Sequence, residues 1–181
     1  MNTLDEKNCL LLLVDVQEKL VAMLEKNTVV KQSNILLQTA NILGIPTIVT
    51  EQYPQGLGKT VDFVAEHINE YTFLFEKTSF SALKDDGFLE KLKSYNKKQV
   101  IVGGIEAHIC VHQTVADLLE NGFEVYVVKD ACASRRKDDF KSGIKLMEQN
   151  GAKISATEAV LFELLKTSKH EHFKEIQNLV K

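Results

Sequence analysis

The chain has 181 residues, of which 44% are hydrophobic and 26% charged, and its formal net charge is -3. This length and composition predict one soluble globular domain over residues 1–181 and exclude an intrinsically disordered chain. Because 22 basic residues stand against 25 acidic ones, no basic excess is available to neutralise phosphates, and we expect no nucleic-acid partner.

The cysteines and the apolar runs indicate the compartment. Cys9, Cys110 and Cys132 lie far apart, in neither a CxxC pattern nor a metal-finger spacing, which is typical of a reducing compartment. The longest apolar run, from Cys9 to Val14, is too short to span a membrane, and the residues before it lack the basic start of a secretory signal. We therefore expect a cytoplasmic protein with no membrane partner.

Short apolar runs alternate with helical patterns along the whole chain, which predicts a parallel sheet with helices on both faces. Most runs are apolar without strict alternation, as strands covered on both sides are. The fold class is therefore α/β: a three-layer α/β/α domain with a six-stranded parallel sheet in a Rossmann-like order. The predicted strands are residues 9–14, 45–50, 72–76, 99–103, 124–128 and 153–156.

Helix signals fill the intervening segments. A helix over residues 29–43 is expected to stop at Gly44, one starting near Cys110 to stop at Asn121-Gly122, and one from about Lys137 to stop at Asn150-Gly151. The turn-rich segment 51–60 is predicted to be a loop at the carboxyl edge of the second strand. Apolar residues at helical spacing in segment 170–181 predict a final helix that docks on the body or on a neighbouring subunit.

Three chemically active side chains occur where predicted strands end. Asp15 follows the first strand, Lys77 the third, and Cys110 lies where the fourth strand runs into a helix. The carboxyl ends of parallel strands converge on one crevice, so we expect these three side chains to meet there. A thiol at the first turn of a helix faces the positive end of the helix dipole, which predicts a lowered pKa for Cys110 and a role as nucleophile.

Five segments carry a family likeness in order along the chain. They are Leu-Val-Asp15-Val-Gln17, Lys77-Thr-Ser-Phe80-Ser, the turn from Gly103 to Cys110, the run from Val127 to Arg135, and Thr157-Glu158. With these marks the sequence resembles the isochorismatase-like cysteine hydrolase family over nearly its whole length. Within that family, segments 50–58 and 173–177 look most like the isochorismatase domain-containing proteins, a subgroup without a settled substrate.

The resemblance implies a hydrolase that attacks a small amide-type substrate and passes through an acyl-enzyme on Cys110. It assigns the thiol proton to Asp15 and the role of ordering cation to Lys77. It also implies a cis peptide between Ile105 and Glu106 and an oxyanion hole made by the backbone N–H groups of Glu106 and Cys110. A homo-oligomer is expected as well. The substrate pocket is expected to include Gln17, Tyr53, Phe80 and His108.

Metal and cofactor are not expected. Nicotinamidases of the family bind a metal through an Asp-x-His pattern with a further His, whereas the corresponding loop here reads Glu51-Gln52-Tyr53. Nicotinamide is accordingly not the expected substrate, and His170-Glu171-His172 is interpreted as a solvated face. True isochorismatases, which cleave a vinyl ether, lack the cysteine at this point, so Cys110 disfavours that reaction as well.

Several alternatives stay open at this point. Asp15 could merely cap a helix, and Lys77 could be a solvated loop lysine. Gln17 and Phe80 either line the pocket or pack and hydrogen-bond beneath it. The whole chain could be a non-catalytic interaction protein on the same fold, or it could have a ribonuclease-like role, which the negative net charge disfavours.

Overall fold

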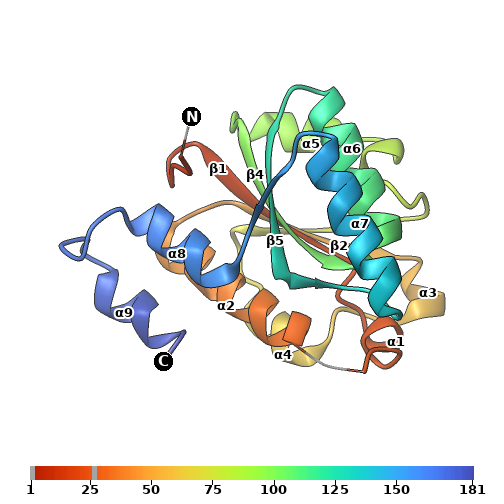
Figure 1. Cartoon of the computed structure of the whole chain (residues 1–181), viewed down its shortest axis with the longest axis horizontal. Helices are drawn as coiled ribbons and strands as arrows, with labels where there is room; N and C mark the ends of the chain where they lie inside the picture. The colour runs from red at the N-terminus through yellow and green to blue at the C-terminus, as the bar shows by residue number, and fades with distance from the viewer. Residues whose placement is uncertain (1–2, 26–27) are drawn as a thin grey trace.

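The computed structural model describes residues 3–25 and 28–181, and its centre is one six-stranded parallel sheet. The strand order is β3-β2-β1-β4-β5-β6, the order of the doubly wound dinucleotide-binding folds (Figure 1). The predicted fold class is confirmed. The strands are β1 (Cys9–Val14), β2 (Thr47–Gln52), β3 (Thr72–Lys77), β4 (Gln99–Ile105), β5 (Glu124–Ala133) and β6 (Lys153–Ser155).

Helices cover both faces of the sheet (Figure 1). One face carries α2 (Thr28–Leu43), α4 (Asp62–Ala65), α8 (Thr157–Leu165) and α9 (Phe173–Asn178), and the other carries α5 (Phe88–Ser94), α6 (His112–Glu120) and α7 (Lys137–Gln149). The connections contain α1 (Glu18–Val21), α3 (Pro54–Leu57), a 3-10 turn (Ala82–Lys84) and a π-helical turn (Ala107–Val111). None of the helices in the described ranges has the length and apolar character needed to cross a membrane.

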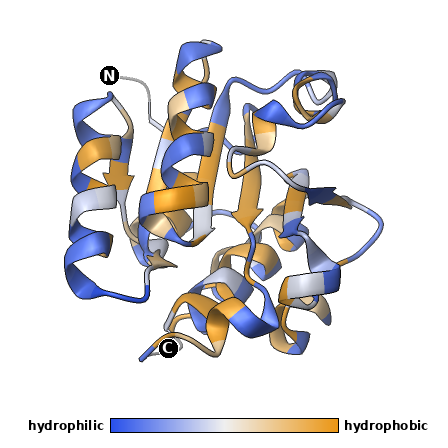
Figure 2. Cartoon of the chain, turned by 90° about the vertical axis from the view of Figure 1, so that its right-hand side faces the viewer, coloured by the Kyte–Doolittle hydropathy of each residue, from blue (hydrophilic) through white to orange (hydrophobic). Residues whose placement is uncertain are grey.

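The apolar residues of β1 pack against the helices on both faces of the sheet. Leu11 and Leu13 belong to the core cluster under α2 and α8, whereas Leu10, Leu12 and Val14 belong to the cluster under α5, α6 and α7. Figure 2 shows apolar strands between helices whose outer sides are polar. Burial on both faces is the reason for the missing alternation in the sequence.

The first strand has its predicted bounds, whereas the second to fifth strands end later than predicted and the sixth ends one residue earlier. The second strand begins at Thr47, because Gly44 turns the chain at a φ of 64° and the Ile45 N–H donates back to Ala40 O at 2.8 Å, which makes Ile45 part of the helix cap. The fifth strand runs to Ala133, because its end pairs with Ile105 of β4 after a shift in register. β6 is correspondingly short and ends at Ser155.

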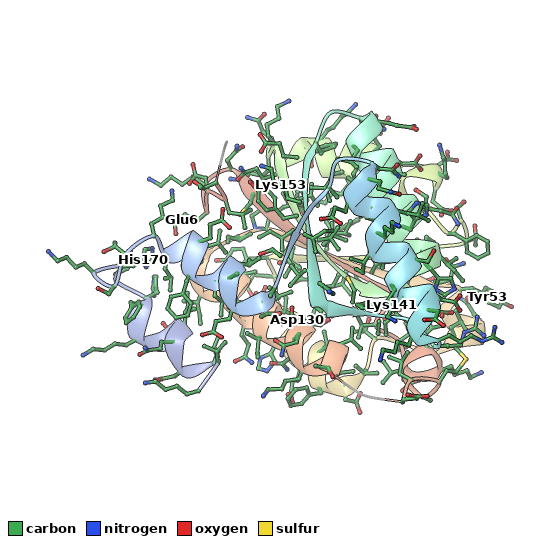
Figure 3. The ribbon with its side chains drawn as sticks, in the orientation of Figure 1. Glu6, Tyr53, Asp130, Lys141, Lys153 and His170 are labelled. Carbon is green, nitrogen blue, oxygen red and sulfur yellow. The ribbon has the colours of Figure 1, made fainter. Side chains whose placement is uncertain are left out.

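The last helix docks on the body of its own chain. Ile176 is fully buried in the core cluster, and the rings of Phe162 and Phe173 lie 6.1 Å apart. His170 Nε2 lies 3.2 Å from Glu6 Oε2, which ties this segment to the start of the chain at the end of the molecule far from Tyr53 (Figure 3).

Candidate active site

Asp15 occupies the centre of the carboxyl edge of the sheet. Its side chain is fully buried, and its backbone adopts a φ of 54°, a left-handed conformation that is rare outside glycine and collects at functional sites. Thr50 Oγ1 donates a hydrogen bond of 2.6 Å to Asp15 Oδ1, and Lys77 Nζ lies 2.8 Å from Asp15 Oδ2. The carboxylate is therefore held from two neighbouring strands.

Lys77 ends β3 and reaches Asp15 past the end of β2. Its ammonium is also fully buried and donates to Gln52 Oε1 at 2.6 Å. It donates further to the carbonyl oxygens of Ser79 at 3.1 Å and Phe80 at 3.0 Å. These contacts exclude the alternative of a solvated loop lysine.

Cys110 lies in the π-helical turn between β4 and α6, close enough to Asp15 that each of the two groups shifts the pKa of the other. Strand ends thus bring all three predicted side chains together. The predicted lowering of the Cys110 pKa is wrong: burial, reinforced by the negative charge of Asp15 and only partly offset by Lys77, raises it to about 12. At neutral pH Cys110 is therefore a thiol, and it lies beside the Asp15 carboxyl group.

Burial also raises the pKa of the Asp15 carboxyl above its ordinary value, although Lys77, Thr50 and Cys110 act in the opposite direction. A carboxylate with a raised pKa is a stronger base than an ordinary one. Asp15 is therefore a better acceptor for the proton of the neighbouring Cys110 thiol than an ordinary carboxylate would be.

The helix predicted to begin near Cys110 begins as α6 at His112, and the intervening turn is π-helical. Gly143 lets α7 lie directly on this turn, because a Cβ there would be 2.7 Å from Ala107 O. The peptide bond between Ile105 and Glu106 is cis, as the resemblance implies.

Gly104 sets the spacing between β4 and the strand that carries Asp15. Its φ is 140°, and a Cβ there would lie 2.1 Å from Val14 O. We expect Gly104→Ala to lower the free energy of unfolding by about 2–4 kcal/mol, through overpacking together with an unfavourable φ. Gly87→Ala is the matched control, with a φ of 83° and no atom within 4 Å of the added Cβ. Equal losses for both variants in urea unfolding would contradict the close approach.

The structure distinguishes the two roles left open for Gln17 and Phe80, which were to line the pocket or to pack and hydrogen-bond beneath it. Gln17 is fully buried; its Nε2 donates to the carbonyl oxygens of Gln52 at 3.0 Å and Gly58 at 2.7 Å, and its Oε1 accepts from the Gln52 N–H at 2.7 Å. These are the contacts of a residue that hydrogen-bonds beneath the pocket. The ring of Phe80 is half exposed, and its carbonyl oxygen, not its ring, contacts Lys77.

Tyr53 borders one hollow, and His108 contacts Ser134, which lines another. Tyr53 is 56% exposed and lines a hollow of about 360 Å³ with Glu76, Lys77 and Asp85. His108 Nδ1 lies 2.9 Å from Ser134 Oγ, at the side of the turn that carries Cys110.

The second hollow lies at the carboxyl end of β5 and has a volume of about 340 Å³. Val29, Ser134, Arg135 and Lys137 are among its lining residues. Arg135 Nε lies 3.0 Å from Glu106 Oε1, so this hollow adjoins the turn that carries Cys110. Through Ser134 and Arg135 this hollow is connected to His108 and Glu106.

Sequence reasoning missed Thr50 and Gln52, which contact Asp15 and Lys77 directly. The available signal was a pair of polar residues two positions apart at the end of an apolar strand, which places both on the same side of the sheet edge. Within the described residues, no three His, Cys, Asp or Glu side chains gather as a metal-binding group.

Comparison with known proteins agrees with this architecture. The isochorismatase domain matches residues 9–159. The chain is 43% identical to isochorismatase domain-containing protein 2 of Danio rerio, covering 98% of this chain and 89% of that one, and 39% identical to isochorismatase family protein 1A of Dictyostelium discoideum, covering 97% and 87%. A solved structure described as the MAR1 ribonuclease of Caenorhabditis elegans superposes with a TM-score of 0.93 at 42% identity, covering 99% of this chain and 92% of that one. The chain therefore belongs to the isochorismatase domain family.

Proposed function

We propose that this protein is a cysteine-dependent hydrolase of small amide-type substrates, with Cys110 as nucleophile. One arrangement carries the proposal: the buried Asp15 carboxyl group pairs with the Lys77 ammonium and lies within electrostatic reach of the Cys110 thiol. Membership of a generally hydrolytic family supports it. No cofactor or metal enters the proposed reaction.

In the first step, Cys110 Sγ forms a bond to the carbonyl carbon while its proton passes to Asp15. The raised pKa of Asp15 suits it to accept this proton, and Lys77 keeps the carboxyl group oriented. The backbone N–H groups of Glu106 and Cys110 are the proposed donors to the oxyanion.

In the second step, the C–N bond breaks as Asp15 returns the proton to the departing nitrogen, leaving a thioester on Cys110. Water then attacks the thioester carbon and gives a proton to Asp15. The C–S bond breaks, the carboxylic acid leaves, and the proton returns to sulfur. The net reaction consumes one water and yields an acid and an amine or ammonia.

The proposal is tested by incubating the purified protein with a panel of small aliphatic and aromatic amides and measuring amine or ammonia release. Cys110→Ser should abolish release, whereas Cys9→Ser, which changes a buried cysteine at the opposite end of β1 from Asp15, should preserve it. Undiminished hydrolysis by Cys110→Ser would contradict the proposal. An inert wild-type protein across the panel would favour the non-catalytic alternative.

Gln52 is a proposed positioning residue, because its side chain accepts from Lys77 Nζ while its backbone is tied to Gln17. We expect Gln52→Leu to lower kcat by about 10–100-fold with little change in KM, since Lys77 loses one of its fixed acceptors. Gln52→Glu keeps an acceptor oxygen and should retain more of kcat. A change confined to KM in Gln52→Leu would instead indicate that Gln52 contacts substrate.

A ribonuclease activity is the second candidate function, because a relative 42% identical over nearly the whole chain is described as a ribonuclease. The enclosed Asp15, which is fully buried, favours a small substrate over a polymer. RNA hydrolysis that Cys110→Ser leaves intact would favour this second candidate. We further propose that the protein is cytoplasmic and forms a homo-oligomer. The exposed apolar side chains of Tyr71 and Leu74, beside and on the edge strand β3, support the homo-oligomer.

A further inference from the structure

A third hollow, of about 340 Å³, runs along α7 and shares Lys137 and Phe140 with the hollow at the carboxyl end of β5. We call it the α7 groove. Four lysines line it, Lys129 from β5 and Lys137, Lys141 and Lys145 from α7, and Figure 3 labels Lys141 on that helix. Its apolar lining comes from Phe140 and Ile144, and Glu148 borders it as well.

The fold itself creates this groove. β6 pairs with residues 126–128 of β5 only, so from Lys129 onward β5 continues beside α7 without a neighbouring strand on that side. Along α7, Lys137, Lys141 and Lys145 recur every four residues and share one face, about 6 Å apart along the axis.

The charge of the groove is largely uncompensated. All four lysines are exposed, and among the residues that the structure describes, Lys129, Lys137 and Lys145 form no ion pair. Asp138 Oδ1 lies 3.6 Å from Lys141 Nζ, and Glu148 is the acidic lining residue. Lysines four residues apart on a helix repel each other, so an anion bound between them would relieve an unfavourable interaction.

We propose that the α7 groove binds a small organic phosphate. Lysine ammonium groups bind phosphoryl oxygens as point charges, and Phe140 and Ile144 offer an apolar surface to the organic part of such a ligand. The volume of the groove lies in the range of small-molecule sites. A small ligand fits better than a nucleic acid, because Glu148 places a negative charge in the lining and the whole chain carries a net charge of -3.

The test is calorimetric titration of the full chain with adenosine monophosphate, with adenosine and inorganic phosphate as partial ligands. Adenosine monophosphate should bind more tightly than either partial ligand, and its affinity should fall as salt is added. The double variant Lys141→Gln/Lys145→Gln should weaken binding by about tenfold or more, since two charge-assisted contacts are lost. The matched control, Lys31→Gln/Lys174→Gln, makes the same change in net charge at exposed lysines of α2 and α9 and should leave binding unchanged.

Three results would overturn the proposal. They are the absence of adenosine monophosphate binding, equal affinities for adenosine monophosphate and adenosine, and equal weakening by the two double variants. If a single-stranded RNA oligonucleotide binds more tightly than adenosine monophosphate, and Lys141→Gln/Lys145→Gln abolishes that binding, the proposal is also overturned. The ligand of the groove would then be a nucleic acid and not a small phosphate. None of these outcomes depends on amide hydrolysis, so the groove and the proposed reaction fail or succeed separately.

Discussion

Asp15→Asn should reduce amide hydrolysis by about 10³–10⁴-fold and at the same time make the Cys110 thiol easier to ionise. The amide cannot accept the thiol proton, so attack on the carbonyl fails. Its neutral side chain also removes the negative charge that helps to raise the Cys110 pKa to about 12, so that pKa should fall. If the Cys110 thiol becomes more reactive while amide turnover falls, the variant has lost a base. If thiol reactivity and turnover both fall, the site is damaged.

The two effects are measured separately. Iodoacetamide labelling of Cys110 across a pH series, read by peptide mapping, gives the thiolate titration, and amine release gives turnover. Lys77→Met is the companion variant: losing the cation should shift labelling to higher pH, because Lys77 lowers the Cys110 pKa. Appreciable turnover by Asp15→Asn, or identical labelling profiles for all three proteins, would refute these assignments.

The second large effect concerns stability. Asp15 and Lys77 form an ion pair with both side chains fully buried. Removing one partner leaves an uncompensated buried charge, so Asp15→Asn and Lys77→Met should each lower the free energy of unfolding by about 3–5 kcal/mol. The double variant Asp15→Asn/Lys77→Met should lose clearly less than the sum, because neither charge remains.

Urea unfolding of the four proteins in this cycle gives the coupling energy. Lys84→Met is the surface control: Lys84 Nζ lies 3.2 Å from Asp117 Oδ1 with the lysine side chain 65% exposed, and its removal should cost no more than about 1 kcal/mol. Strict additivity of the Asp15 and Lys77 variants would mean that the two charges do not interact across the site.

The sequence was sufficient to predict the convergence of Asp15, Lys77 and Cys110, because strand ends follow directly from apolar runs and parallel strands share one carboxyl edge. The Rossmann-like order expected for the sheet is the order found. The family resemblance added the cis peptide between Ile105 and Glu106.

Burial and local shape could not be predicted in the same way. The pKa of Cys110 depends on how completely the turn excludes water, and the helix-dipole argument contains no such information. The hydrogen bonds from Thr50 to Asp15 and from Lys77 to Gln52 depend on how neighbouring strand ends align. The α7 groove stayed hidden because a net charge of -3 says nothing of where single charges gather.

The central claim is that Cys110 carries the acyl group during hydrolysis. It is tested most directly by mixing the protein with a cleaved amide, quenching in acid, and measuring intact mass followed by peptide mapping. We predict a mass increase equal to the acyl group, located on Cys110, absent in Cys110→Ser and strongly diminished in Asp15→Asn. Hydrolysis without any adduct, or an adduct on Cys9 or Cys132, would contradict the claim.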